Sequence, residues 1–118
     1  MHRILVIDDD PSVCSFLRRG LMLAGFTVQT AADGPAGLEA LERFAPHLVI
    51  LDRKMGGMSG PEVLARLRER CPRLPVIMLT GRVPEDSEDD GLGVEAYLIK
   101  PVEFQELLGT IGALIGRP

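Results

Sequence analysis

The chain has 118 residues, of which 46% are hydrophobic and 25% are charged, and its formal net charge is −4. This composition excludes a disordered chain, and the length allows one domain with one hydrophobic core. No apolar run approaches the roughly 20 residues that cross a bilayer, and the N-terminus has no signal-peptide pattern. The sequence therefore predicts one cytoplasmic domain over residues 1–118, with no membrane span and no broad nucleic-acid surface.

Short apolar runs, separated by segments with helical spacing of apolar residues, predict the strands of the domain. The expected strands are residues 3–8, 26–30, 47–52, 75–80 and 96–100. The first, third and fourth runs are continuous enough to be buried on both faces of a sheet. Alternation of strands and helices predicts an α/β fold with a parallel sheet and helices on both faces.

Amphipathic segments between these runs predict the helices. Asp10 and Ser59 are expected N-caps, and Ser59 forms a capping box with Glu62. The expected apolar faces comprise Val13, Phe16, Leu17, Leu21 and Ala24; Leu38, Leu41 and Ala45; Val63, Leu64, Leu67 and Cys71; and Phe104, Leu107, Leu108, Ile111 and Ile115. Residues 81–93 contain few apolar side chains and many acids, so a fourth helix there is expected to be short or irregular.

Chemically reactive side chains stand at the ends of four expected strands. They are Asp8 and Asp9 on the first, Asp52 on the third, Thr80 on the fourth and Lys100 on the fifth. Because the carboxyl ends of parallel strands meet at one edge, these groups are expected to converge. Clustered carboxylates repel one another and suit a hard cation such as Mg²⁺, and the hydroxyl and ammonium suit a phosphoryl group. No histidine or cysteine stands at these strand ends, which argues against zinc.

The segments that carry these residues are similar to the receiver domain of two-component response regulators. The similar segments are ILVIDDDP, HLVILDRKMGGMSGPEVL, PVIMLTG and AYLIKP, in this order along the chain. Together they extend the resemblance over essentially the whole sequence. The resemblance implies a flavodoxin-like, doubly wound sheet of five parallel strands in the order 2-1-3-4-5.

The resemblance also implies a role for each residue of the site. Asp52 would be the phosphoacceptor, and the Lys100–Pro101 peptide bond would be cis. The implied Mg²⁺ ligands are Asp8, mainly through water, the side chains of Asp9 and Asp52, and the backbone carbonyl of Lys54. The implied phosphoryl-binding and switch residues are Thr80, Lys100 and Tyr97.

By this resemblance the chain would be a signalling switch and no enzyme in the ordinary sense. A sensor histidine kinase or a phosphotransfer protein would supply the phosphoryl group. The surface of helix four, strand five and helix five would then change and act on an output domain or a partner protein. The chain is expected to be either a whole protein or a part of a longer regulator.

The sequence departs from the family pattern at three places. Gly56 stands where the family usually has proline, so the loop after Asp52 is expected to be more mobile. Lys54 has two candidate partners, a phosphoryl oxygen or an acid of residues 81–93. The span from Thr80 to Lys100 is about half a helical turn shorter than usual in the family.

Two other functions remain open at this point. Asp8 and Asp10 form a D-x-D pattern that resembles haloacid dehalogenase-like phosphatases, in which Asp8 would be the nucleophile. A receiver-like binding module without phosphorylation is the other possibility. Separately, Gly109, Gly112 and Gly116 lie along one side of the last helix and predict either a homodimer contact or a helix end of low stability.

Overall fold

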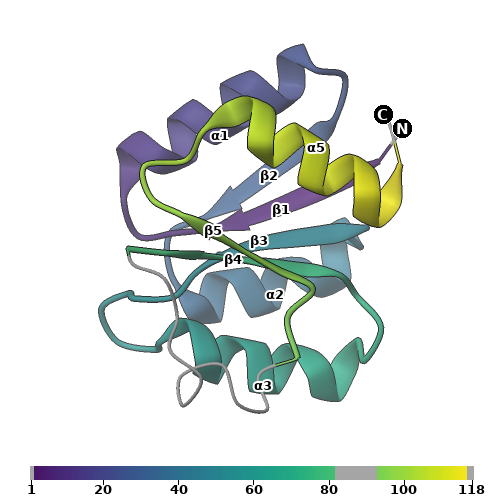
Figure 1. Ribbon diagram of the computed structural model, residues 1–118. Helices are drawn as coiled ribbons and strands as arrows, with labels where there is room; N and C mark the ends of the chain where they lie inside the picture. Colours follow the sequence, from purple (N-terminus) through teal and green to yellow (C-terminus); the bar gives the residue numbers. More distant parts are fainter. Residues whose placement is uncertain (1, 82–92, 117–118) are drawn as a thin grey trace.

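The computed structural model describes residues 2–81 and 93–116. Its elements, labelled in Figure 1, are β1 (Arg3–Ile7), α1 (Pro11–Leu23), β2 (Thr27–Ala31), α2 (Gly34–Phe44), β3 (Leu48–Asp52), α3 (Gly60–Arg70), β4 (Val76–Thr80), β5 (Ala96–Ile99) and α5 (Phe104–Ile115). Each expected strand is present within one residue of its predicted bounds. Residues 82–92, which include most of the expected fourth helix, lie outside the described residues.

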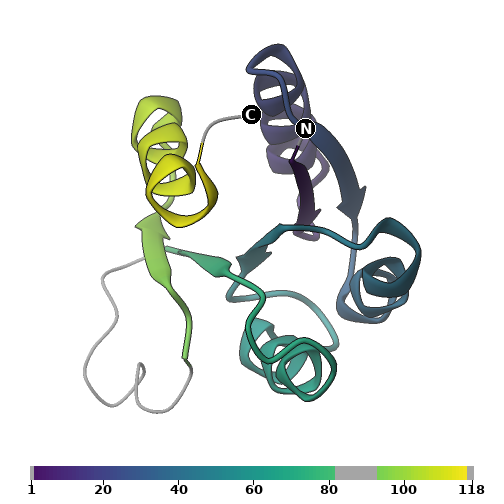
Figure 2. The ribbon, with the colours of Figure 1, turned by 90° about the vertical axis from the view of Figure 1, so that its right-hand side faces the viewer.

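The strands form one parallel sheet in the order β2-β1-β3-β4-β5, which confirms the predicted fold. Figure 2 shows α1 and α5 on one face of the sheet and α2 and α3 on the other. Alternate residues of β1 supply the two faces: Ile4 and Val6 belong to the core under α1 and α5, and Leu5 and Ile7 to the core under α2 and α3. β3 and β4 are buried along their whole length, as their apolar runs predict.

The helix starts follow from local side-chain hydrogen bonds. The carboxylate of Asp10 accepts from the N–H of Ser12, and that of Asp33 accepts from Ala36. Ser59 and Glu62 make both hydrogen bonds of the capping box that the sequence predicts. These bonds satisfy N–H groups that have no partner within the first turn of a helix.

Two members of the expected apolar faces are exposed. Phe16 is 50% exposed, and its ring meets the ring of Phe104 edge to face, with 5.9 Å between centroids. Ala45 lies beyond the last residue of α2, where its backbone adopts a left-handed φ of 49°. Pro46 accounts for this end, because a proline disfavours helical backbone at the residue before it.

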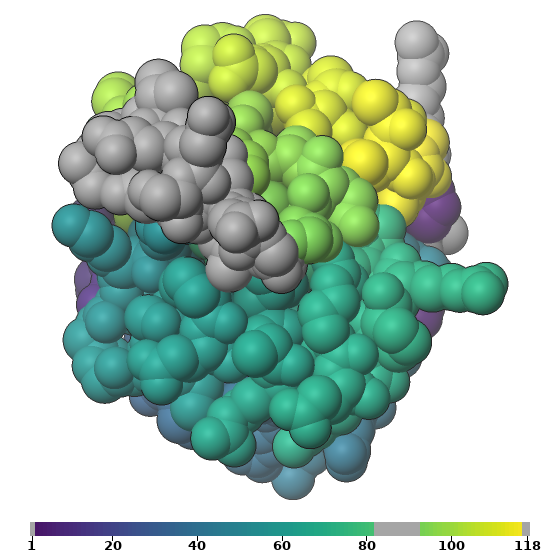
Figure 3. Space-filling view, turned by 60° about the horizontal axis from the view of Figure 1, so that its bottom comes forward, coloured from purple at the N-terminus to yellow at the C-terminus, as the bar shows by residue number. Residues whose placement is uncertain are grey.

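Arg68 of α3 fixes the start of β5. Its guanidinium donates to the carbonyls of Leu74 and Gly93 and to Oε1 of Glu95, and that same oxygen accepts from the N–H of Val76. Figure 3 shows the light-green surface around β5 between α3, in teal, and α5, in yellow. One side chain thus joins the helix, the start of β4 and the edge strand.

In the part of the chain that the structure describes, no helix combines the length and the apolar character that a membrane span requires.

Candidate functional site

Three aspartates converge where β1 and β3 end. The two strands pair side by side, with Ile7 next to Leu51, so the residues at their carboxyl ends are neighbours. One oxygen each of Asp8, Asp9 and Asp52 lies within 4.8 Å of the others. Asp8 is 1% exposed and Asp52 is 4% exposed, whereas Asp9 is open to solvent.

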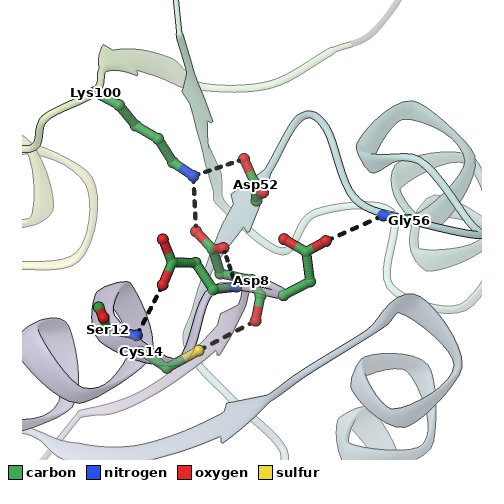
Figure 4. A network of polar contacts seen from close by, with 8 residues as sticks. Asp8, Ser12, Cys14, Asp52, Gly56 and Lys100 are labelled. Atoms are coloured by element: carbon green, nitrogen blue, oxygen red, sulfur yellow. Dashed lines mark hydrogen bonds and ion pairs between the residues drawn. The ribbon is translucent and has the colours of Figure 1, made fainter.

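Lys100 brings a positive charge to the two buried acids. Its Nζ lies 3.1 Å from Oδ2 of Asp8 and 3.1 Å from Oδ1 of Asp52, as Figure 4 shows. The backbone carries the lysine there, because the N–H of Lys100 continues the pairing of β5 with β4 by donating to the carbonyl of Thr80. Burial opposes the charged lysine, but the hydrogen bonds to Asp52 and Asp8 and the negative charges of these acids together outweigh it and raise the pKa of Lys100.

The pocket disfavours the ionised form of the Asp52 carboxylate. Burial raises the pKa of Asp52, and the charge of Asp8 raises it further. A hydrogen bond from Lys100, its charge and the N–H of Lys54 act in the opposite direction without cancelling the rise. A second cation in the pocket would therefore stabilise the ionised acids.

Backbone groups fix the orientation of the acid pair. Oδ1 of Asp8 accepts from the N–H of Asp10 at 2.9 Å. Oδ2 of Asp9 accepts from the N–H of Gly56 at 3.1 Å, across 47 residues of sequence. Asp9 is therefore linked to the loop between β3 and α3, and Asp8 to the start of α1.

Cys14 lies next to this pocket, which the sequence did not indicate. Its Sγ donates to the backbone carbonyl of Asp8 at 3.2 Å. Burial raises the pKa of Cys14, and the charge of Asp8 adds to the rise. The sequence could have indicated this position of Cys14, because the residue lies one turn into α1 and that turn must pass the end of β1.

The chain after Asp52 turns back closely on itself. The N–H of Gly60 donates to the carbonyl of Arg53 at 2.9 Å. A Cβ at position 60 would lie only 2.5 Å from the carbonyl oxygen of Asp52, which is backbone that cannot easily move. The start of α3 thus requires a glycine in order to lie against the end of β3.

Of the remaining expected site residues, Thr80 and Lys54 lie at the carboxyl end of the sheet, and Tyr97 lies earlier along β5. Thr80 ends β4 and is 4% exposed, and Lys54 is exposed just beyond β3. Tyr97 lies in β5 beside Met78 and packs, partly buried, against the core under α2 and α3. The Lys100–Pro101 peptide bond is cis.

The chemistry of the acid cluster fits a hard divalent cation. All three ligand atoms are carboxylate oxygens, and they are close enough to face one ion. Mg²⁺ is bound by one or two carboxylates and keeps several of its waters, so the partly open Asp9 leaves room for a hydrated ion.

The parallel, doubly wound sheet with acids and a lysine at its carboxyl edge defines the protein as an α/β domain with an acidic site at its strand ends. Known proteins that are similar in sequence and structure agree with this description. The family model for the response regulator receiver domain matches residues 4–112. The chain is 38% identical over 117 residues to the transcriptional regulatory protein PrrA of Mycobacterium tuberculosis, a match that covers 98% of this chain and 50% of PrrA. The chain belongs to the receiver-domain family of response regulators, as the sequence resemblance predicts, and spans about half the length of the curated relatives it matches.

Solved structures show the same fold. The chemotaxis protein CheY4 of Vibrio cholerae superposes with a TM-score of 0.92 at 28% identity, with 98% of this chain and 99% of CheY4 covered. The response regulator TrrA of Thermotoga maritima, solved in complex with Mg²⁺-BeF, superposes with a TM-score of 0.88 at 32% identity, covering 98% of this chain and 100% of TrrA.

Proposed function

We propose that this receiver domain is a phosphorylation-dependent switch that accepts a phosphoryl group on Asp52. The convergence of Asp8, Asp9 and Asp52, two of which pair with the ammonium of Lys100, is the observation that carries the proposal. Asp52 is favoured over Asp8 as acceptor because 6% of its side chain is exposed, whereas the side chain of Asp8 is fully covered. The donor is a phosphohistidine of a sensor kinase or of a phosphotransfer protein.

The proposal includes Mg²⁺ as the cofactor. The side chains of Asp9 and Asp52 and the backbone carbonyl of Lys54 would hold it, with Asp8 acting mainly through water. The all-oxygen donor set supports this choice, as does the complex named for TrrA. When bound, the ion supplies positive charge that offsets both the mutual repulsion of the acids and the charge of the phosphoryl oxygens.

The residues of the chain then position the reacting groups. A carboxylate oxygen of Asp52 attacks phosphorus, so that a P–O bond forms as the P–N bond to the donor histidine breaks. The ammonium of Lys100 neutralises charge on the transferring group, and the hydroxyl of Thr80 donates to one of its oxygens. Water later hydrolyses the acyl phosphate and restores the carboxylate.

The switch lies on the β4 and β5 side of the pocket. Movement of Thr80 toward the phosphoryl group would open space for Tyr97 to turn inward, which would change the surface of β5, α5 and the fourth helix that the sequence leads us to expect. An output domain, a partner protein or a second copy through α5 would read that surface. We place this signalling role in the cytoplasm and assign the domain no direct contact with nucleic acid.

Phosphorylation with a small donor tests the proposal. The parent chain, Asp52→Asn and the control Glu39→Gln are incubated with acetyl phosphate, with and without Mg²⁺, and analysed by intact mass and peptide mapping. Glu39 is a suitable control because its carboxylate is exposed and pairs with Arg43 on the same helix. We expect one phosphoryl group on the parent and on the control, only with Mg²⁺, and none on Asp52→Asn. Labelling of Asp8 would favour a phosphatase-like reaction, and no adduct would favour a binding module.

A further inference from the structure

The loop between β3 and α3 reaches the metal-binding acids through one backbone group. The N–H of Gly56 donates to Oδ2 of Asp9 at 3.1 Å, although the two residues belong to separate parts of the chain. Figure 4 shows the nitrogen of Gly56 at the end of a dashed line on the loop side of the site. Asp9 is the exposed member of the acid cluster, so without this bond its side chain would be held least firmly.

The loop is itself anchored on both sides of Gly56. Met55 and Met58 are partly buried and pack against the core under α2 and α3. Gly60 then lies against the backbone of Asp52 and Arg53. The N–H of Gly56 is therefore presented to Asp9 from a segment whose neighbours are fixed.

We infer that the N–H of Gly56 is a positioning group for Mg²⁺ binding: it holds the carboxylate of Asp9 toward Asp8 and Asp52. This inference rests on the proposed function, because it assigns Asp9 as a ligand. Hydrogen bonds to a ligating carboxylate orient it, and their loss costs about tenfold or more in metal affinity. Because one oxygen of Asp9 accepts from Gly56, the other stays available to an ion.

Mg²⁺ binding and the Gly56–Asp9 hydrogen bond must strengthen each other. If the Gly56 N–H strengthens Mg²⁺ binding by about tenfold, Mg²⁺ strengthens the Gly56–Asp9 hydrogen bond by the same factor. Exchange of the Gly56 amide hydrogen should then slow by up to about tenfold when Mg²⁺ binds. This second effect does not depend on phosphorylation.

Position 56 allows a closely matched pair of variants. A Cβ at Gly56 would meet no atom within 4 Å, and the backbone there has no left-handed φ, so Gly56→Ala keeps both the fold and the N–H. Gly56→Pro removes the N–H and leaves every acid in place. Far-UV circular dichroism and urea unfolding establish that both variants are folded.

Mg²⁺ affinity is measured by isothermal titration calorimetry, and amide exchange by NMR. We expect Gly56→Ala to bind Mg²⁺ within about twofold of the parent and Gly56→Pro to bind about tenfold more weakly. We also expect Mg²⁺ to slow exchange at residue 56 in the parent and in Gly56→Ala. Equal affinities for all three proteins, or exchange at residue 56 that ignores Mg²⁺, would overturn this inference.

These measurements distinguish an error in the role of Gly56 from an error in the proposed function. If the parent binds Mg²⁺ and is phosphorylated on Asp52 while Gly56→Pro binds equally well, only the role of Gly56 is wrong. If the parent binds no Mg²⁺, the magnesium part of the proposed function is wrong and the role of Gly56 is refuted with it.

Discussion

Lys100 lies 3.1 Å from Asp52, Nζ to Oδ1, although β4 separates the strands that carry the two residues. The same Nζ also reaches Asp8, so one ammonium neutralises acids at the ends of β1 and β3. Both acids are almost fully covered. The ion pairs therefore hold the edge of the sheet to its centre, and their removal would leave two buried charges without compensation.

Replacing Lys100 with methionine should destabilise the protein. We expect a loss of about 3 kcal/mol in the free energy of unfolding in EDTA, because removing one partner of a buried ion pair leaves the other charge unpaired. Excess Mg²⁺ should recover part of the loss, since it supplies positive charge to the same acids. Urea unfolding measures both effects.

Lys54→Met is the matched control, because Lys54 is the other lysine of the chain and is exposed. Its stability should stay within about 0.5 kcal/mol of the parent. A Lys100→Met protein as stable as this control in EDTA would show that the ion pairs contribute nothing to folding.

Asp52→Asn should be more stable than the parent at neutral pH without metal. Because the folded-state pKa of Asp52 is raised, its ionisation favours the unfolded chain, and the parent loses stability as the pH rises through that pKa. The asparagine variant does not ionise and escapes this loss. Urea unfolding in EDTA should therefore show a stability gap that widens from acid to neutral pH. A gap that narrows over this range would mean that the pocket favours the carboxylate instead.

Gly60→Ala should destabilise the fold by roughly 1–3 kcal/mol, because the added methyl group would press on the carbonyl of Asp52. Gly109→Ala serves as its control. A Cβ at Gly109 would meet nothing within 4 Å, and alanine favours a helix interior by up to about 1 kcal/mol. Thermal unfolding should move in opposite directions for the two variants, and a Gly60→Ala protein as stable as the parent would contradict the close approach.

Cys14 should react slowly with iodoacetamide at neutral pH, because burial and the charge of Asp8 raise its pKa and keep the thiol protonated. Asp8→Asn removes the charge and should speed alkylation several-fold at mildly alkaline pH. The measurement uses a Cys71→Ala background and mass spectrometry, so that only Cys14 reacts. Equal rates with and without the Asp8 charge would place the thiol away from that carboxylate.

Local sequence patterns predicted the elements of this fold closely. The capping box at Ser59 depends on residues three apart, so it is visible in the sequence and is present in the structure. The order of the strands followed from the resemblance. The edge at which Asp52 and Lys100 meet followed from the rule that parallel strands end together.

The contacts that the sequence did not predict depend on how the elements pack together. The bonds of Arg68 to Gly93 and Glu95, and the approach of Gly60 to Asp52, depend on how helices pack against the sheet. Phe16 is a further example. Helical spacing places it on the apolar face of α1, but the spacing does not reveal that this part of the face remains exposed to solvent. Such features are set by tertiary packing and leave no local pattern.

Within residues 2–81 and 93–116, β5 is the last strand of the sheet and pairs only with β4. Arg68 and Glu95 fasten its beginning, while Lys100 at its far end meets the acids. A tilt of β5 about its fastened end would disturb its pairing with β4, and the other strand pairs of the sheet would be kept. Any movement that Lys100 passes to β5 would therefore disturb fewer strand pairings than a movement of an inner strand.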